Sequence, residues 1–154
     1  MRAAALAAWA TLAIPHVLPA QAHPLVGAWD LTYAAGMQVE NGVATPIEAT
    51  AGFTVTLEGD SLIAVLERPA VDGMAQRPPS RFTTPLSTTW PIVFRQTSEA
   101  TLSMGGGTEK RTAISVWSLT VTGDVIEGSV ERSIEGLDLP TAGPQPVRGV
   151  RKES

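Results

Sequence analysis

The sequence has no cysteine, and this absence excludes several classes of functional site. Without a thiol the chain can form no disulfide bond, no cysteine nucleophile and no site in which cysteine binds zinc or an iron–sulfur cluster. Histidine is almost as scarce, because His16 and His23 are the only two in 154 residues. A catalytic triad or a histidine base in the body of the chain is therefore not expected.

Positive charge is also in short supply. The chain has 11 basic and 15 acidic residues, which gives a formal net charge of −4 at pH 7, and the basic residues form no cluster. Nucleic acids and anionic membrane surfaces attract proteins that carry clustered positive charge. We therefore expect neither of them as a partner.

The one long apolar run lies at the N-terminus. A basic start at Arg2 is followed by an almost unbroken apolar run over residues 3–14, and small residues lead up to Ala22. This is the pattern of a secretory signal peptide, and the run is too short for a transmembrane helix. We predict a signal peptide over 1–22, cleaved after Ala22, and a periplasmic or secreted protein with a single domain over 23–154.

The rest of the chain is typical of β-strands and turns. It is rich in threonine and valine, which favour strands, and it shows no convincing amphipathic helix. Residues 53–68 align without gaps on residues 117–132, either as a duplicated unit or as two hairpins of similar pattern. Short turn-forming pairs between alternating segments predict two-residue hairpins. These pairs are Asn41-Gly42, Gly59-Asp60 and Gly123-Asp124.

Alternation along the two repeat copies assigns their side chains to an inner and an outer face. On the outer face the first copy has Ile63 and Val65, where the second has Glu127 and Ser129. This apolar outer surface needs a cover, which is either a segment of the same chain or a partner, including a second copy. The predicted core positions are Phe53, Val55, Leu57, Leu62, Ala64, Leu66, Trp117, Leu119, Val121, Ile126, Gly128 and Val130.

Further strands predict the fold class. Short strands are expected at 29–33, 90–95, 102–104 and 147–151, and the longest loop at 69–81. The total is eight to ten antiparallel strands without intervening helices. This pattern favours an all-β, antiparallel up-and-down barrel, with a β-sandwich as the alternative.

The first of these strands carries a Gly-x-Trp sequence, Gly27-Ala28-Trp29, at the start of the predicted domain. This opening resembles lipocalin-like (calycin) barrels, and the whole layout is similar to small secreted bacterial proteins of this type. The resemblance implies that Trp29 plugs the closed end of the barrel. It also implies that a basic residue near the last strand packs across it, with Arg151 as the first candidate and Arg148 as the second.

Few residues are candidates for chemistry. Glu67 and Glu131 occupy equivalent repeat positions, but neighbouring outward Glu and Arg side chains are more typical of solvated strand ends than of a catalytic carboxylate pair. His23 is expected to be a frayed polar chain end rather than a metal ligand. We therefore expect no catalytic residue, no metal site and no cofactor. Candidates for ligand stacking are the aromatic residues Tyr33, Trp90 and Trp117.

These features leave two main hypotheses, beside a third in which the carboxylates of Glu67 and Glu131 serve a hydrolase. The first is a non-enzymatic barrel that binds a small apolar or amphipathic ligand at its open end. The alternative is an interaction or assembly module that uses an apolar strand face or a sheet edge, for example self-association through Ile63 and Val65.

Overall fold

The structure is a computed structural model that describes residues 22–41, 43–70, 76, 78–104, 106–138 and 143–153. Most of the predicted signal peptide, residues 1–21, lies outside the described residues. All regular secondary structure in the described part of the chain is β-strand, so no helix there is long and apolar enough to cross a membrane. The strands are β1 (Gly27–Glu40), β2 (Val43–Glu58), β3 (Ser61–Glu67), β4 (Ser80–Pro85), β5 (Ile92–Met104), β6 (Gly107–Thr122), β7 (Val125–Ile134) and β8 (Gln145–Arg151).

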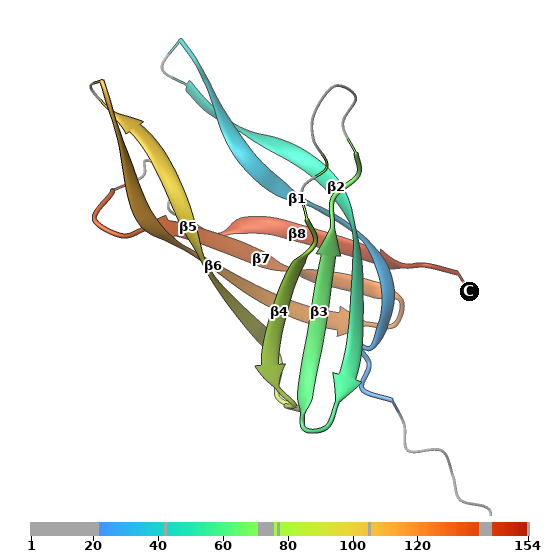
Figure 1. Ribbon diagram of the computed structural model, residues 1–154. Helices are drawn as coiled ribbons and strands as arrows, with labels where there is room; N and C mark the ends of the chain where they lie inside the picture. Colours follow the sequence, from blue (N-terminus) through green and yellow to red (C-terminus); the bar gives the residue numbers. More distant parts are fainter. Residues whose placement is uncertain are drawn as a thin grey trace, which may run out of the picture.

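The eight strands form one antiparallel sheet that curls into a nearly closed barrel (Figure 1). Their order in the sheet is β4-β3-β2-β1-β8-β7-β6-β5, so that the first strand in the chain pairs with the last. Strands β4 and β5 end this order and lie next to each other without a hydrogen-bonded ladder between their described residues. The predicted all-β, up-and-down barrel is therefore confirmed.

Three two-residue turns lie where the sequence predicts them. Glu40 pairs with Val43 across the first turn, and corresponding pairs flank the second and third turns. Gly59 and Gly123 open the latter two with φ angles of 57° and 60°, a backbone region that glycine adopts without strain. Local turn chemistry thus sets the register of three of the hairpins.

The core fills the inside of the barrel with side chains that alternate along each strand. Most of the predicted core positions are buried, and Val121 is partly buried against them. Leu57 is a wrong prediction, because 45% of it is exposed at the end of β2, beside the N-terminal segment. Gly128 was also placed in the core and is exposed instead. Its inner side faces the backbone of Ser118, which leaves no room for a side chain.

The second half of the sheet differs from the prediction in the length of its strands. Strand β5 is one continuous element, whereas two short strands were expected at 90–95 and 102–104. Pairing with β6 along its whole length makes it continuous, and such long-range pairing is not visible in local sequence. Strand β4 begins inside the predicted loop over 69–81.

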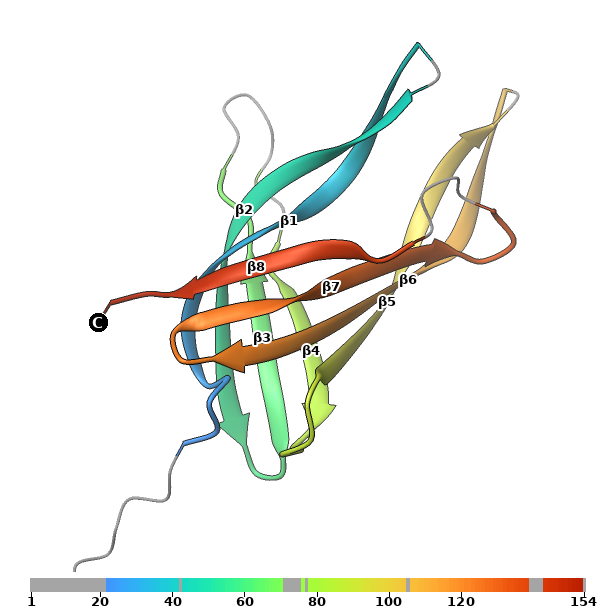
Figure 2. The same cartoon turned by 180° about the vertical axis from the view of Figure 1, so that it is seen from behind.

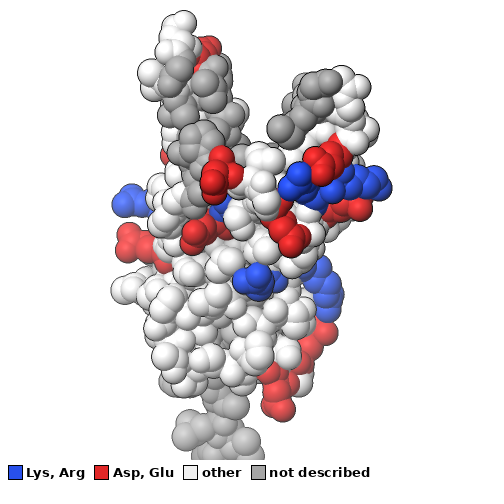
Figure 3. Space-filling model, turned by 90° about the vertical axis from the view of Figure 1, so that its left-hand side faces the viewer, with Lys and Arg blue, Asp and Glu red and all other residues white. Residues whose placement is uncertain are grey.

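Two hairpins extend beyond the barrel as two-stranded ribbons. Strand β8 pairs with β1 only as far as Tyr33, and the β1–β2 register shifts directly afterwards, between Ala34 and Gly36. The rest of this hairpin forms the first ribbon, and the outer part of β5 and β6 forms the second. Figure 2 shows both ribbons at the end opposite the N-terminal segment. In Figure 3 they appear as separate projections with a notch between them.

Gly128 gives a direct test of the packing between β6 and β7. A Cβ atom at this position would lie 2.0 Å from the backbone oxygen of Ser118, so Gly128→Ala must push the two strands apart. Overpacking of this kind costs about 1–3 kcal/mol of unfolding free energy. Gly143→Ala is the matched control, because its Cβ would meet nothing within 4 Å. Urea unfolding of both variants measures the difference, and equal stability would contradict this account of Gly128.

Candidate functional site

One end of the barrel is sealed around Trp29. This side chain is fully buried, and its Nε1–H donates to the backbone oxygen of Leu25 at 2.9 Å. Leu25 is itself fully buried, so the segment that precedes β1 folds back over the indole. A tryptophan side chain combines a large apolar surface with one N–H group that needs an acceptor when buried, and this contact supplies the acceptor. This end therefore holds a hydrogen-bonded plug.

Arg151 covers the plug from outside. Its guanidinium carbon lies 4.1 Å from the centroid of the Trp29 ring, which is the contact that the sequence resemblance implies for this residue. The guanidinium also donates to the backbone oxygens of Pro24 and Val26, and Nε donates to Asp124 Oδ1 at 3.0 Å. Gly27 has a φ angle of 139°, a backbone conformation that other residues rarely adopt, and a Cβ there would also lie 2.5 Å from Arg151 Nη1, so glycine is favoured at this position.

Two other residues considered from the sequence are Arg148, which lies on β8 opposite Thr32, and His23, which lies in the segment before β1. Arg148, the second candidate for the Trp29 contact, is exposed on the outer face of β8. His23 is 9% exposed, so the predicted frayed chain end is wrong. The Nδ1 atom of its ring accepts from the Leu25 N–H, which leaves Nε2–H to donate to Ser87 at 3.0 Å. The ring also packs on Trp90, and both nitrogens are thus engaged in holding the closed end.

The opposite end contains a different group of side chains, which we name the mouth cluster: Tyr33, Phe82, Trp117 and Arg132. These residues come from β1, β4, β6 and β7. Tyr33 is the last residue of β1 that pairs with β8, and Arg132 lies near the end of the pairing between β6 and β7. The mouth cluster is therefore the top layer of the barrel, where the two ribbons begin.

The rings of the mouth cluster pack at tilted angles. The ring centroids of Tyr33 and Trp117 are 5.3 Å apart, and those of Phe82 and Trp117 are 5.7 Å apart. The Arg132 guanidinium carbon lies 5.8 Å from the Tyr33 ring centroid and 5.9 Å from that of Trp117. Two of the three aromatic residues predicted to contact a ligand thus meet here, while the third, Trp90, lies at the closed end.

Two polar atoms of the mouth cluster have no partner. Tyr33 is 2% and Trp117 is 3% exposed, yet the Tyr33 hydroxyl and the Trp117 Nε1–H form no hydrogen bond in the described part of the chain. A buried polar group without a partner costs about 1–3 kcal/mol, and most such groups in proteins are paired. Both atoms belong to the same ring contact, so the cost is concentrated at one place.

Arg132 is the charged member of the mouth cluster. It donates from Nη1 to the backbone oxygen of Ala34, and none of the ion pairs between described residues includes it. Burial lowers the pKa of its guanidinium, and the nearby charge of Arg68 lowers that pKa further, while the Tyr33 hydroxyl acts in the opposite direction. The cation at Arg132 is therefore less well solvated than it would be in water.

Sequence reasoning missed Arg68 and Arg132, although the repeat contains a signal for them. They are equivalent positions in the two copies, and each follows a buried residue, Leu66 or Val130, by two positions. Alternation therefore places both arginines on the inner face of their strands. The glutamates next to them, Glu67 and Glu131, are instead the positions that the repeat suggests as candidates for chemistry.

Those two glutamates do not form a pair. Glu67 and Glu131 are exposed on β3 and β7, and the sheet order places β2, β1 and β8 between these strands. Four strand spacings amount to about 19 Å along the sheet. Among the described residues no group of three or more His, Asp or Glu side chains is placed to hold a metal ion.

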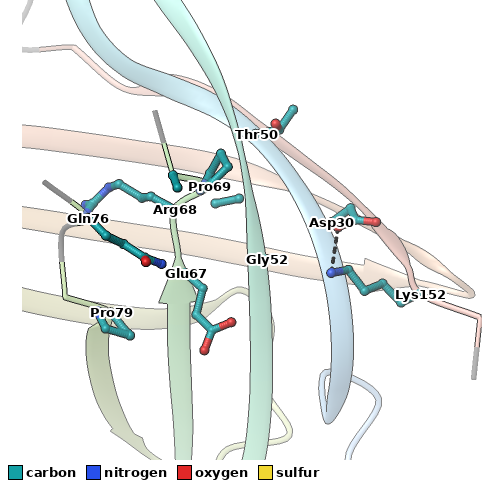
Figure 4. A pocket seen from close by; sticks show the side chains of 11 residues that line it. Asp30, Thr50, Gly52, Glu67, Arg68, Pro69, Gln76, Pro79 and Lys152 are labelled. Carbon is teal, nitrogen blue, oxygen red and sulfur yellow. Dashed lines mark ion pairs between the residues drawn. The ribbon is translucent and has the colours of Figure 1, made fainter. Parts of the chain in front are cut away.

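Glu67 lines a separate hollow on the outer face of the sheet, about 630 Å³ in volume (Figure 4). Across this hollow Lys152 pairs with Asp30 at 3.0 Å, and both side chains are well exposed. Figure 4 shows the side chains of Glu67 and Arg68 pointing in different directions from the end of β3. The hollow is an open, polar surface whose drawn ion pair is already formed. Of the three buried side-chain atoms without a hydrogen-bond partner in the described part of the chain, two lie in the mouth cluster, the third is Arg111 Nε on β6, and none lies in this hollow.

The outward apolar residues of β3 are partly covered within the chain. Ile63 is 6% exposed and Val65 is half-buried. An ion pair of 3.4 Å joins Arg81 on β4 to Glu58 on β2, and the register places Ile63 between them. Long side chains can cover apolar surface with their stems in this way.

The Arg151 contacts predict a measurable difference between two arginines of the last strand. Arg151→Lys keeps the charge but loses the planar stacking on Trp29 and most of the fork of hydrogen bonds, so we expect a loss of about 1–3 kcal/mol. Arg148→Lys is the matched control, with an expected change within about 0.5 kcal/mol because this side chain is exposed. Chemical denaturation measures both, and a neutral Arg151→Lys would refute the sealing role.

Comparison with known proteins adds no further assignment. No protein family model matches the sequence, and neither a curated protein nor a solved structure matches the chain. The resemblance to lipocalin-like barrels therefore stays a prediction. What supports it is the arrangement of Gly27, Trp29 and Arg151 at the sealed end.

Proposed function

We propose that this protein is a non-enzymatic β-barrel that binds a small amphipathic molecule at the mouth cluster. The observation that carries the proposal is the pair of buried polar atoms, Tyr33 Oη and Trp117 Nε1, that have no hydrogen-bond partner in the part of the chain that the structure describes. A ligand that supplies the missing partner would remove the cost of burying them. We further propose, on the basis of the N-terminal sequence, that this binding takes place in the periplasm or outside the cell.

The direction of entry follows from the two ends of the barrel. At the closed end the Trp29 plug and Arg151 occupy the opening, and the barrel below the mouth cluster is filled by buried side chains. A ligand therefore has access from the ribbon end, above the cluster. The notch between the ribbons in Figure 3 leads toward this end.

The first ribbon offers apolar contacts along this route. By alternation along β2, Val43 and Ile47 lie on the face that continues the inner face of the barrel from Phe53. They are 64% and 47% exposed, because the ribbon has no second layer to cover them. A ligand with an apolar part above the cluster would bury them, and burial of apolar surface is worth about 25 cal/mol per Å².

Nile red, a neutral dye that fluoresces in apolar surroundings, tests this route. We expect saturable binding to the wild-type protein and a loss of at least about tenfold in affinity for Ile47→Glu, because the carboxylate brings charge onto the apolar face. Val150→Glu is the matched control, since Val150 is 60% exposed on the outer face of β8 and should leave binding unchanged. Equal effects of the two substitutions, or no saturable binding at all, would contradict the proposed route.

A protein-binding role through a sheet edge is the second candidate. It is favoured by the edges of β4 and β5, which are not paired with each other, because unpaired edges can take up another strand. If a second copy is the partner, light scattering should show a dimer that Val65→Lys dissociates, since Val65 lies on β3 beside this edge. A monomer of unchanged mass at all concentrations would leave ligand binding as the supported function.

A further inference from the structure

We infer that the ligand carries a negatively charged head group, a carboxylate, which binds between Arg132 and the two unpaired donors of the mouth cluster. This inference rests on the proposed function and names the chemical class of the ligand. Its basis is the kind of group that the cluster presents and the charge that surrounds it.

The cluster presents donors in excess. The Trp117 indole N–H and the Arg132 guanidinium can only donate hydrogen bonds, and the Tyr33 hydroxyl has a proton to donate. Apart from the Ala34 backbone oxygen that Arg132 already uses, no acceptor is bonded to these groups among the described residues. The missing partner must therefore be an acceptor with several lone pairs, and a carboxylate has about four such sites on two oxygens.

The charge around the cluster favours an anion over a neutral acceptor. Arg132 is half-buried and has no carboxylate partner among the described residues, and its repeat equivalent, Arg68, adds positive charge to the same region. Among the described residues, the Arg68 side chain forms one hydrogen bond, a long one of 3.4 Å to Ser80, and no ion pair. A charge that is removed from water without a counterion is unfavourable, and a bound anion would compensate both arginines.

Geometry favours a planar carboxylate in particular. A guanidinium and a carboxylate can form two parallel hydrogen bonds, and such charge-assisted bonds are about twice as strong as neutral ones. The Arg132 guanidinium carbon lies within 6 Å of the Tyr33 and Trp117 ring centroids, so a carboxylate bound to it would lie beside the two rings that carry the unpaired donors. Rotation of the Arg132 side chain, which is partly exposed, would open the donors to the head group.

The remainder of the ligand would then extend toward the ribbons. Below the mouth cluster the barrel is filled, whereas Ile47 and Val43 lie exposed above it. The expected ligand is therefore a single-chain amphiphile whose carboxylate is its innermost part. An inner charged group is favourable here only because Arg132 and the unpaired donors are already in place.

Decanoate and decanol test the inference, because they share a chain length and differ in the head group. We expect calorimetry of the full domain, at concentrations below micelle formation, to show at least about tenfold tighter binding of decanoate. This preference should weaken as salt is raised, since counterions screen the arginines. Acetate alone, measured in parallel, reports on the head group without the chain and should bind more weakly than decanoate.

Three variants assign the preference to the cluster. Arg132→Met should reduce decanoate affinity to that of decanol, and Tyr33→Phe should reduce decanoate affinity several-fold while decanol binding is unchanged. Arg148→Gln, which removes an exposed arginine on the outer face of β8, is the control and should change neither. The urea midpoint of Arg132→Met should be equal to or higher than that of the wild type, which separates lost binding from lost folding.

The outcomes distinguish this inference from the function on which it rests. Tighter decanoate binding that depends on Arg132 and Tyr33 supports both. Equal binding of decanoate and decanol, or a preference that survives Arg132→Met, overturns the carboxylate assignment and leaves the binding function intact. If neither amphiphile nor Nile red binds, the proposed function itself fails.

Discussion

The contact between Arg151 and Trp29 is the constraint on which the rest of the barrel depends. It joins the first strand to the last, and the same guanidinium holds the segment before β1 and the turn between β6 and β7. Three parts of the chain that are distant in sequence, residues 24–29, Asp124 and β8, thus meet at one side chain. Gly27 suits this arrangement because its φ of 139° favours glycine and because a Cβ there would displace the Arg151 guanidinium. In a chain without disulfides, such a polar clamp over a buried aromatic closes one end of the sheet.

Much of the fold could be predicted from sequence because its determinants are local. Alternation with a period of two assigns Phe53, Val55 and Leu119 to the core, and the turn pairs fix three hairpins. The errors have non-local causes. Leu57 keeps the alternation but lies at the rim, and Gly128 keeps it too, although the neighbouring strand comes too close for a side chain. The sequence of a single strand shows neither where the buried part of that strand ends nor how closely the neighbouring strand approaches it.

The mouth cluster, too, could be predicted from the sequence only in part. Tyr33 and Trp117 could be named as aromatic candidates, but their meeting depends on the register of strands β1, β8, β7 and β6, which local sequence does not determine. Trp90 is an aromatic candidate on the same grounds, yet it lies at the closed end, where it packs on His23. Arg132, by contrast, was within reach of the sequence. Its inner position follows from alternation through Val130, and a charged residue on an inner face departs from the pattern of a core.

The two ends of the barrel use the same residue types with opposite results. At the closed end a tryptophan donates its indole N–H to a backbone oxygen and an arginine pairs with Asp124. At the mouth a tryptophan has no acceptor and an arginine has no carboxylate among the described residues. An arginine contacts an aromatic ring at both ends. The two ends therefore differ in whether a hydrogen-bond acceptor and a negative charge are available to these groups. The chain pairs its tryptophan N–H with an acceptor and its arginine with a carboxylate at the closed end, but among the described residues it does neither at the mouth. Such a local departure from complete pairing is expected where a protein binds another molecule. That contrast is why the mouth, and not the plug, is the site to test.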